Sequence, residues 1–423
     1  MSRRTFRSVL VVALASASLS GCWLQVGFDA GHTGFNRFED HILPPNVATL
    51  APVWSADLQQ TASEPMVRGN RVFLTTGGVD ATSGEGAIDA RAFDAATGTL
   101  AWNRRFITLC CRPGVVYTPA AFVGDEMWTG WFMLLSSPRP VGGFRSPVRL
   151  DPADGSIIGS EENVATSAAV EASVGPPADG ERVVVQTRLH TGTPSRSVVV
   201  RDSDTLETRW TAELPGSLDM EPVAPAVQDG QVFVADRTSL SAFPLEGCGA
   251  PTCTPTWTLD LGNPLKTVVA GPIGREVFTI SGDDLVAVSR ATGTVSWTAS
   301  LGAPAPGLAM MADTVYVAAG TTLHAFAGSG CGAPTCTAGW TAAVDAGATA
   351  SPIVAGGVVY VGGNGAVGAF PAHGCGAPTC DGYVTLPVAG PVDHLSLAGG
   401  RLFVVSRPAG TGLSRLTAFA PTG

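Results

Sequence analysis

Three copies of one cysteine-containing sequence have residue types and spacing that could do chemistry. Gly-Cys-Gly-Ala-Pro-Thr-Cys occurs at 247–253, 330–336 and 374–380. Each copy offers two thiols, whereas a zinc site needs four converging ligands, and redox catalysts favour Cys-x-x-Cys at a helix start. In an exported protein such a pair forms a local disulfide. The expected pairs are Cys248 with Cys253, Cys331 with Cys336, and Cys375 with Cys380.

Two further cysteines, Cys110 and Cys111, are adjacent in the chain. Adjacent cysteines can close a strained ring through a vicinal disulfide, and such a ring could face a cofactor. The alternatives are a disulfide that only rigidifies a loop, or two buried thiols. The sequence leaves these interpretations open.

The N-terminus has the features of an export signal. Arg3, Arg4 and Arg7 precede a short apolar stretch that ends in Leu-Ser-Gly and Cys22. This order resembles the bacterial lipobox, in which a peptidase cuts before a cysteine that carries lipid. We therefore expect a signal peptide over 1–21, a lipidated Cys22 and a short tether over 22–25.

The charge of the chain limits its partners. Removal of residues 1–21 takes away three of the 25 basic residues and none of the 35 acidic ones. An acidic surface repels nucleic acid and anionic lipid. We expect no nucleic-acid partner, and attachment to a membrane through the lipid alone.

Internal repeats organise the rest of the chain. A pattern of apolar residues, a Gly or Asp turn and a β run begins near 63, 118, 174, 224, 270, 305, 351 and 393. Each copy predicts two antiparallel strands joined by a tight turn. A second pattern, two more strands, follows each copy, and a unit of roughly 38–56 residues is typical of a propeller blade.

The second pattern carries a family resemblance. Ala92-x-Asp94-x-x-Thr97-Gly98-x-x-x-Trp102 resembles the tryptophan-docking repeat of β-propellers of the pyrroloquinoline-quinone (PQQ) type. The copy at 287–297 keeps most of this motif and has Ser289 in place of the aspartate. The resemblance implies that each tryptophan packs against the neighbouring blade. It extends over most of residues 25–423 and concerns the fold rather than the function.

These observations predict an all-β protein with one domain over 26–423. We expect an eight-bladed β-propeller of four-stranded antiparallel blades, closed by the strand around Trp54, which completes the last blade. The second blade has about Gly159 where the others have a docking aromatic residue. The expected docking residues are Trp54, Trp102, Trp210, Trp257, Trp297, Trp340 and Tyr383.

Acidic residues before the inner strands are the candidates for ligand binding. Glu64, Glu221 and Asp393 precede such strands, and His394 follows Asp393. They could form an acidic channel mouth for cationic or hydroxyl-rich ligands. The alternative is that they are solvated loop residues.

We interpret the chain as a non-enzymatic, monomeric lipoprotein on the extracytoplasmic face of the cell envelope that binds a protein partner. The propeller lipoprotein of the outer-membrane β-barrel assembly machinery is similar in architecture. No metal or cofactor is expected. The alternative is a quinoprotein dehydrogenase with PQQ and Ca²⁺, or a propeller that binds a sugar or small ligand. In that family a vicinal disulfide lies against the quinone, which would be the role of Cys110 and Cys111. A third possibility is a purely structural surface protein.

Overall fold

The computed structural model is almost entirely β-structure in the part of the chain it describes. One short 3-10 helix, Val47–Thr49, is the exception among these residues. None of the helical residues in the described part forms a segment long and apolar enough to cross a membrane. The described ranges are 22–79, 86–109, 115–133, 145–162, 165–174, 181–189, 196–203, 205–214 and 223–422.

The strands form successive four-stranded meanders in which each strand pairs antiparallel with the next. Apolar residues fill the middle strands of these sheets, and Gly or Asp turns separate them, as the sequence pattern predicts. The first three sheets are β4 (Met66–Arg68), β5 (Arg71–Val79), β6 (Gly86–Asp94) and β7 (Leu100–Leu109); β8 (Val115–Val123), β9 (Glu126–Met133), β10 (Arg145–Leu150) and β11 (Ile157–Glu162); and β12 (Ala165–Val174), β13 (Glu181–Leu189), β14 (Arg196–Asp202) and β15 (Thr208–Leu214). A short strand β3 (Thr61–Ala62) also pairs with β5.

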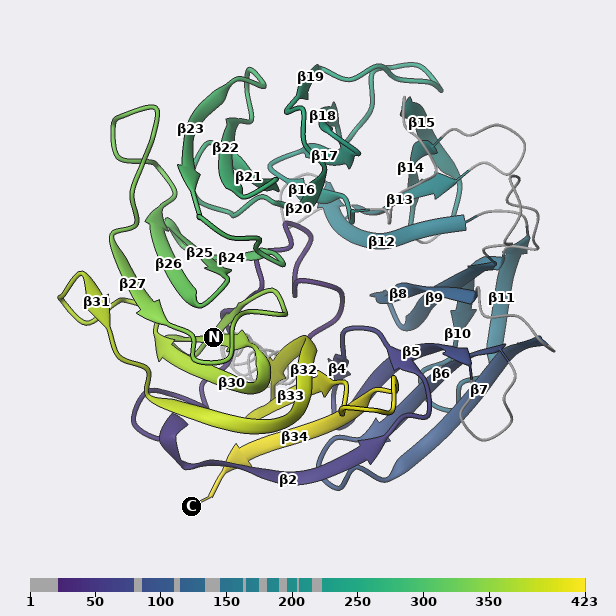
Figure 1. Ribbon diagram of the computed structural model, residues 1–423. Helices are drawn as coiled ribbons and strands as arrows, with labels where there is room; N and C mark the ends of the chain where they lie inside the picture. Colours follow the sequence, from purple (N-terminus) through teal and green to yellow (C-terminus); the bar gives the residue numbers. More distant parts are fainter. Residues whose placement is uncertain are drawn as a thin grey trace, which may run out of the picture.

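Three further sheets have shorter strands. They are β16 (Ala226–Gln228), β17 (Gln231–Asp236), β18 (Ser239–Pro244) and β19 (Trp257–Asp260); β20 (Leu265–Val269), β21 (Glu276–Ser281), β22 (Asp284–Ser289) and β23 (Val295–Ser300); and β24 (Leu308–Met311), β25 (Thr314–Ala319), β26 (Thr322–Ala327) and β27 (Trp340–Ala343). The sheets are arranged around a common centre, which the N-terminal part of the chain crosses (Figure 1).

The remaining strands form one continuous eight-stranded sheet. Its order is β1 (Phe35–Asn36), β28 (Ile353–Ala355), β29 (Val358–Gly362), β30 (Asn364–Pro371), β32 (Val384–Ala398), β33 (Arg401–Ser406), β34 (Arg415–Pro421) and β2 (Leu50–Asp57). The long strand β32 pairs with β30 through its first half and with β33 through its second half. The first long strand of the chain, β2, pairs antiparallel with the last, β34, so the two ends of the chain lie side by side (Figure 1).

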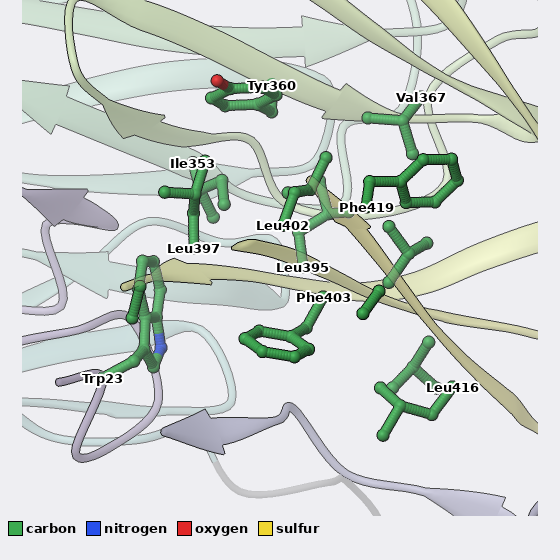
Figure 2. Packing of buried hydrophobic residues seen from close by; sticks show 14 of the residues in the cluster. Trp23, Ile353, Tyr360, Val367, Leu395, Leu397, Leu402, Phe403, Leu416 and Phe419 are labelled. Atoms are coloured by element: carbon green, nitrogen blue, oxygen red, sulfur yellow. The ribbon is translucent and has the colours of Figure 1, made fainter. Parts of the chain in front are cut away.

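The hydrophobic core lies within and between these sheets. Figure 2 shows part of the cluster around the eight-stranded sheet, where Trp23, Tyr360 and Phe403 lie near one another with aliphatic residues between them. Each of these three side chains is fully buried. Burial of a large apolar side chain stabilises a fold by about 1.5–3 kcal/mol, so contacts between sheets supply much of the stability.

Neighbouring sheets are joined by tryptophan–glycine contacts. The ring of each docking tryptophan lies on a glycine in the turn of the next sheet, where an added Cβ would come within 2.5–2.8 Å of the ring. All six glycines have positive φ, so glycine is required by both the backbone and the ring. The pairs are Trp54 with Gly98, Trp102 with Gly155, Trp210 with Gly247, Trp257 with Gly293, Trp297 with Gly330, and Trp340 with Gly374.

The indole nitrogen strengthens five of these contacts. It donates a hydrogen bond of 2.8–3.1 Å to a backbone carbonyl two or three residues before the glycine. A buried indole N–H needs such a partner. The acceptors are Ala95, Pro152, Leu245, Arg290 and Gly328.

Two junctions depart from this rule. Where the ring is missing, at Gly159, the turn of the following sheet carries Leu206 instead of a glycine, and its side chain packs against Val123 and Trp128. Tyr383 was expected to dock like the tryptophans, but its side chain is 38% exposed. At this junction β32 runs from one sheet into the next, so the backbone itself holds the two sheets together.

Candidate functional site

The residues that could act on a ligand would line the centre of the ring of sheets, and the chain itself occupies one end of this centre. Residues 23–36, which we call the channel segment, run past the inner strands of successive sheets. Carbonyl groups of this segment accept hydrogen bonds of 2.6–2.8 Å from inner-strand amides. The amides belong to Val67, Phe122, Val227, Ala270, Met310 and Val354.

These amides lie at or next to the C-terminal end of each inner strand, on the edge that faces the centre. Such an edge exposes unpaired N–H groups, and a buried N–H without a partner costs roughly 1–3 kcal/mol. The channel segment satisfies them one by one. It also pairs with the eight-stranded sheet through β1, and the Asn36 side chain donates to the Leu397 carbonyl at 2.8 Å. The channel segment therefore crosses the centre of the sheets at this end of the inner strands (Figure 1).

The local sequence explains the path of the channel segment. The Asp29 carboxylate accepts hydrogen bonds from the Thr33 amide at 3.0 Å and the Thr33 hydroxyl at 2.6 Å, which closes a tight turn. Within this turn a Cβ on Gly31 would lie 2.0 Å from the Ala270 carbonyl oxygen, so only glycine allows the approach. His32 has positive φ and is buried, and burial lowers its pKa to about 4. Its imidazole is therefore neutral and serves packing.

Glu64 holds the start of the channel segment. One oxygen, Oε1, accepts hydrogen bonds from the Trp23 indole at 2.7 Å and from the Gly27 amide at 2.9 Å. Burial raises its pKa to about 7, although these two donors lower it. The expected role of Glu64 at an open acidic mouth is thus replaced by a structural one, because its carboxylate is already used by the channel segment.

Asp393 and His394 lie on β32, in the sheet that precedes Glu64 around the ring. Asp393 forms an ion pair with Arg407 at 2.8 Å. Burial lowers the pKa of His394; the Asp393 carboxylate raises it and Arg407 lowers it. Asp393 is therefore paired rather than available as a free acid. Glu221, also expected at this mouth, lies outside the described residues, as do Cys110 and Cys111.

The expected tether over residues 22–25 also needs correction. Trp23 exchanges two backbone hydrogen bonds with Val67, at 2.7 and 2.8 Å, and its side chain is completely buried. Gln25 forms a bridge with Ala121. The chain is thus held in the body directly after Cys22, because the indole fills a site in the main core cluster.

The cysteine loops form the three disulfides that their spacing predicts, and they have a second role. Each loop follows the third strand of its sheet and lies beside the outer strand of the preceding sheet. The residue after the docking tryptophan, Thr211, Thr298 or Thr341, donates its amide to the proline carbonyl of the loop at 2.8–2.9 Å. These contacts form parallel bridges to Thr252 and Thr335, and in the third loop the short strand β31 (Thr379–Cys380).

A buried ionic cluster was not predicted from the sequence. The Asp89 carboxylate is fully buried and contacts the guanidinium groups of Arg91 at 3.0 Å and Arg105 at 2.8 Å. Arg91 also donates to the Leu58 carbonyl and to the Gln60 side chain. The cluster ties the segment after β2 to β6 and β7. The available signal was Asp89 and Arg91 two positions apart in a strand, which places both on one face.

The described residues contain one close group of three metal-type ligands, Glu39, Asp40 and His41. Both oxygens of Glu39 are occupied, since they accept hydrogen bonds from the amides of His41, Ile42 and Gly400 at 2.9–3.2 Å. Asp40 and His41 are exposed. These hydrogen bonds hold the segment before β2 against the turn after β32. Because they already use both Glu39 oxygens, we do not interpret the group as an ion site.

Two surface grooves lie on either side of the first half of β32. One, of about 260 Å³, is lined by small residues such as Gly363 and Gly368 and by the carboxylates of Asp345 and Asp381. The other, of about 500 Å³, lies between β2, β32 and β34 and is lined by residues such as Pro52, Val53, Pro387 and Val388.

Comparison with known proteins defines the class of protein. Residues 281–374 match the family described as outer membrane protein assembly factor BamB, a PQQ-type repeat family. No curated protein matches the chain. The fold is that of a β-propeller, and the resemblance inferred from the docking repeat is confirmed.

Solved structures similar to this chain have diverse functions. The quinohemoprotein alcohol dehydrogenase ADHIIG from Pseudomonas putida HK5 has a TM-score of 0.64 at 13% identity, covering 97% of this chain and 82% of that one. BamB from Moraxella catarrhalis has a TM-score of 0.55 at 15% identity, covering 88% and 97%. Sqt1 from Saccharomyces cerevisiae has a TM-score of 0.55 at 10% identity, covering 88% and 99%. At these identities the likeness concerns the fold alone.

Proposed function

We propose that this protein is a non-enzymatic lipoprotein of the cell envelope whose β-propeller is a scaffold for a protein partner. We further propose that the propeller is closed and has eight blades, with β2 as the outer strand of the last one. The pairing of β2 with β34 and the division of β32 between two sheets support this closure.

Anchoring is supported by the sequence before Cys22 and by the disulfides, which are typical of exported proteins. The test is a Cys22→Ser variant expressed in a bacterium with lipoprotein processing. The parent should acquire acyl chains, seen in the mass of its N-terminal peptide, and should fractionate with membranes. The variant should lose both properties. A parent without acyl chains would contradict the anchor.

The observation that carries the scaffold role is apolar surface on the outer strands. Val53 on β2, Leu100 on β7, and Ile157 and Ile158 on β11 are 48–50% exposed, and these strands belong to three successive sheets. We propose that these neighbouring outer strands form the surface that contacts the partner. The groove beside β2, which Val53 lines, lies next to this surface.

A matched pair of variants tests this role. Leu100→Asp with Ile157→Asp should abolish recovery of a defined envelope partner in a pull-down at physiological salt. Val295→Asp should not, because Val295 is similarly exposed, at 43%, on β23 in a different sheet. Equal recovery of the partner with both variants would reject this surface. A parent protein that recovers no partner would reject the scaffold role.

The quinoprotein alternative is favoured by the structural likeness to an alcohol dehydrogenase and by the adjacent cysteines. Adding PQQ with Ca²⁺ to the purified protein and measuring quinone absorbance and dye-linked alcohol oxidation tests it. Activity that disappears in Cys110→Ser would establish this alternative, whereas we expect no activity.

A further inference from the structure

We propose that the lipid anchor holds this protein in one orientation, with the face that carries the channel segment toward the bilayer and the opposite face away from it. The inference rests on the proposed lipidation of Cys22. It concerns which surface faces zwitterionic lipid and which remains accessible to a partner.

The first step is that no flexible linker follows the anchor. Trp23 is bonded to Val67 through both backbone groups and to Glu64 through its indole, and its ring packs edge-on against Phe28 at 5.3 Å between centroids. An acyl chain on Cys22 is therefore one residue away from a fixed, completely buried side chain. A long polar linker lets the body of an anchored protein rotate relative to the membrane, whereas a linker of one residue does not.

The second step is the direction in which Cys22 leaves the body. Trp23 pairs antiparallel with Val67. Strand β4 runs from Met66 to Arg68 and then turns at Gly69. Cys22 therefore lies toward the Arg68 end, on the face that carries the turns between the first and second strands of the sheets. The channel segment contacts the inner strands on this same face.

The third step is that this face can approach lipid. Two acidic side chains in its turns are paired with arginines, Asp125 with Arg68 at 2.5 Å and Asp229 with Arg290 at 2.8 Å. Ile273, in the turn between β20 and β21, is 54% exposed and can enter the interface. The same face carries the turns between the third and fourth strands, whose acidic residues include Asp94 and Asp154. The lipid anchor and apolar contacts, rather than anionic headgroups, therefore decide the approach.

Site-directed fluorescence tests the orientation. In a Cys110→Ser, Cys111→Ser background, a polarity-sensitive fluorophore is attached to Ile273→Cys or to Asp283→Cys. Both positions lie in turns of the sheet β20–β23, at opposite ends of its strands. The lipidated protein is reconstituted into phosphatidylcholine vesicles that contain a spin-labelled lipid quencher. We expect several-fold stronger quenching at position 273 than at position 283.

A second variant with ten Gly/Ser residues inserted between Cys22 and Trp23 should lose most of this difference. Equal quenching at the two positions in the parent, with the protein bound to vesicles, would overturn the orientation and leave the anchor intact. Failure to float with vesicles, together with an unmodified N-terminal peptide, would instead overturn the anchor. Coupling Cys22 of the signal-free chain to a maleimide lipid then tests the orientation by itself, with the same two expected outcomes.

Discussion

The contacts that join neighbouring sheets differ between two regions of the molecule, β4–β15 and β16–β32. In the first region the middle strands are long, such as β5 and β6 with nine residues each, and a buried ionic cluster links β6 and β7 to the segment after β2. In the second region the corresponding strands β21 and β22 have six residues each, and disulfide loops pair with the preceding sheets. Shorter strands bury less area, and the loops add backbone bonds between sheets.

The tryptophan–glycine contact is shared by both regions, and its removal should have the largest effect. Trp297→Ala removes a ring packed on Gly330 and leaves a large cavity, so we expect a loss of about 3–5 kcal/mol in the free energy of unfolding. Tyr383→Ala, at the equivalent position, should cost about 1 kcal/mol or less because this side chain is partly exposed. Urea denaturation measures both, and similar losses would contradict the distinction between the two junctions.

The ionic cluster specific to the first region comes next. Asp89→Asn removes the negative charge from two arginines, of which Arg91 is buried, and we expect a loss of about 3 kcal/mol. The matched control is Asp57→Asn, which breaks the exposed pair with Arg415 and should cost at most about 1 kcal/mol. Equal losses of unfolding free energy in urea denaturation would show that the buried cluster stabilises the protein no more than the exposed ion pair does.

The disulfide loops specific to the second region should have a smaller effect. Cys331→Ser with Cys336→Ser opens a short loop, which we expect to cost about 2 kcal/mol. Hydrogen exchange gives the sharper measurement. The Thr298 amide, which donates to the Pro334 carbonyl, should lose protection, while the Thr211 amide, which donates to the Pro251 carbonyl of an intact disulfide loop, should be unchanged. Unchanged exchange at Thr298 would mean that the loop pairs with β23 without its disulfide.

The channel segment joins both regions, and its pH dependence should be the smallest effect. The pKa of Glu64 is raised to about 7 in the folded state, so the folded protein holds this proton more tightly than the unfolded chain. Its contribution is complete below about pH 4.5, the ordinary value, and is lost as the pH rises through 7. Glu64→Gln keeps an oxygen that can accept from Trp23 and Gly27. The parent should therefore lose about 1–2 kcal/mol relative to this variant between pH 5 and 8.

Thermal denaturation of the parent and of Glu64→Gln across this pH range measures the effect. A difference that is constant with pH would show that Glu64 does not titrate in the folded protein. A parent that gains stability relative to the variant at high pH would show that the carboxylate is better accommodated than its burial implies.

Much of the fold could be predicted because its signals are local. The tryptophan and the glycine of each docking pair stand in recognisable motifs, such as Thr97-Gly98 and Trp102. The cysteines of each loop are close in the chain, so their pairing needs no knowledge of the fold. Tyr383 shows the limit of the motif, because its burial depends on whether β32 continues into the next sheet.

The candidate site was less predictable because it depends on contacts between distant residues. Glu64 has the sequence context of a channel residue, and in the structure its carboxylate accepts hydrogen bonds from the channel segment. The residues that occupy its carboxylate, Trp23 and Gly27, are about 40 positions earlier in the chain. Likewise, the buried cluster needs Asp89 to meet Arg105 from the next strand.

By itself, the amino-acid sequence determined the repeating four-stranded unit, the docking rings and the disulfide pairs. These depend on side-chain periodicity, turn residues and short loops, which act over a few positions. Only the tertiary structure decided that the N-terminal segment contacts the inner strands, that the Glu64 carboxylate accepts hydrogen bonds from this segment, and that the cysteine loops pair with neighbouring sheets. Each of these follows from backbone edges that become neighbours only when the sheets assemble around a common centre.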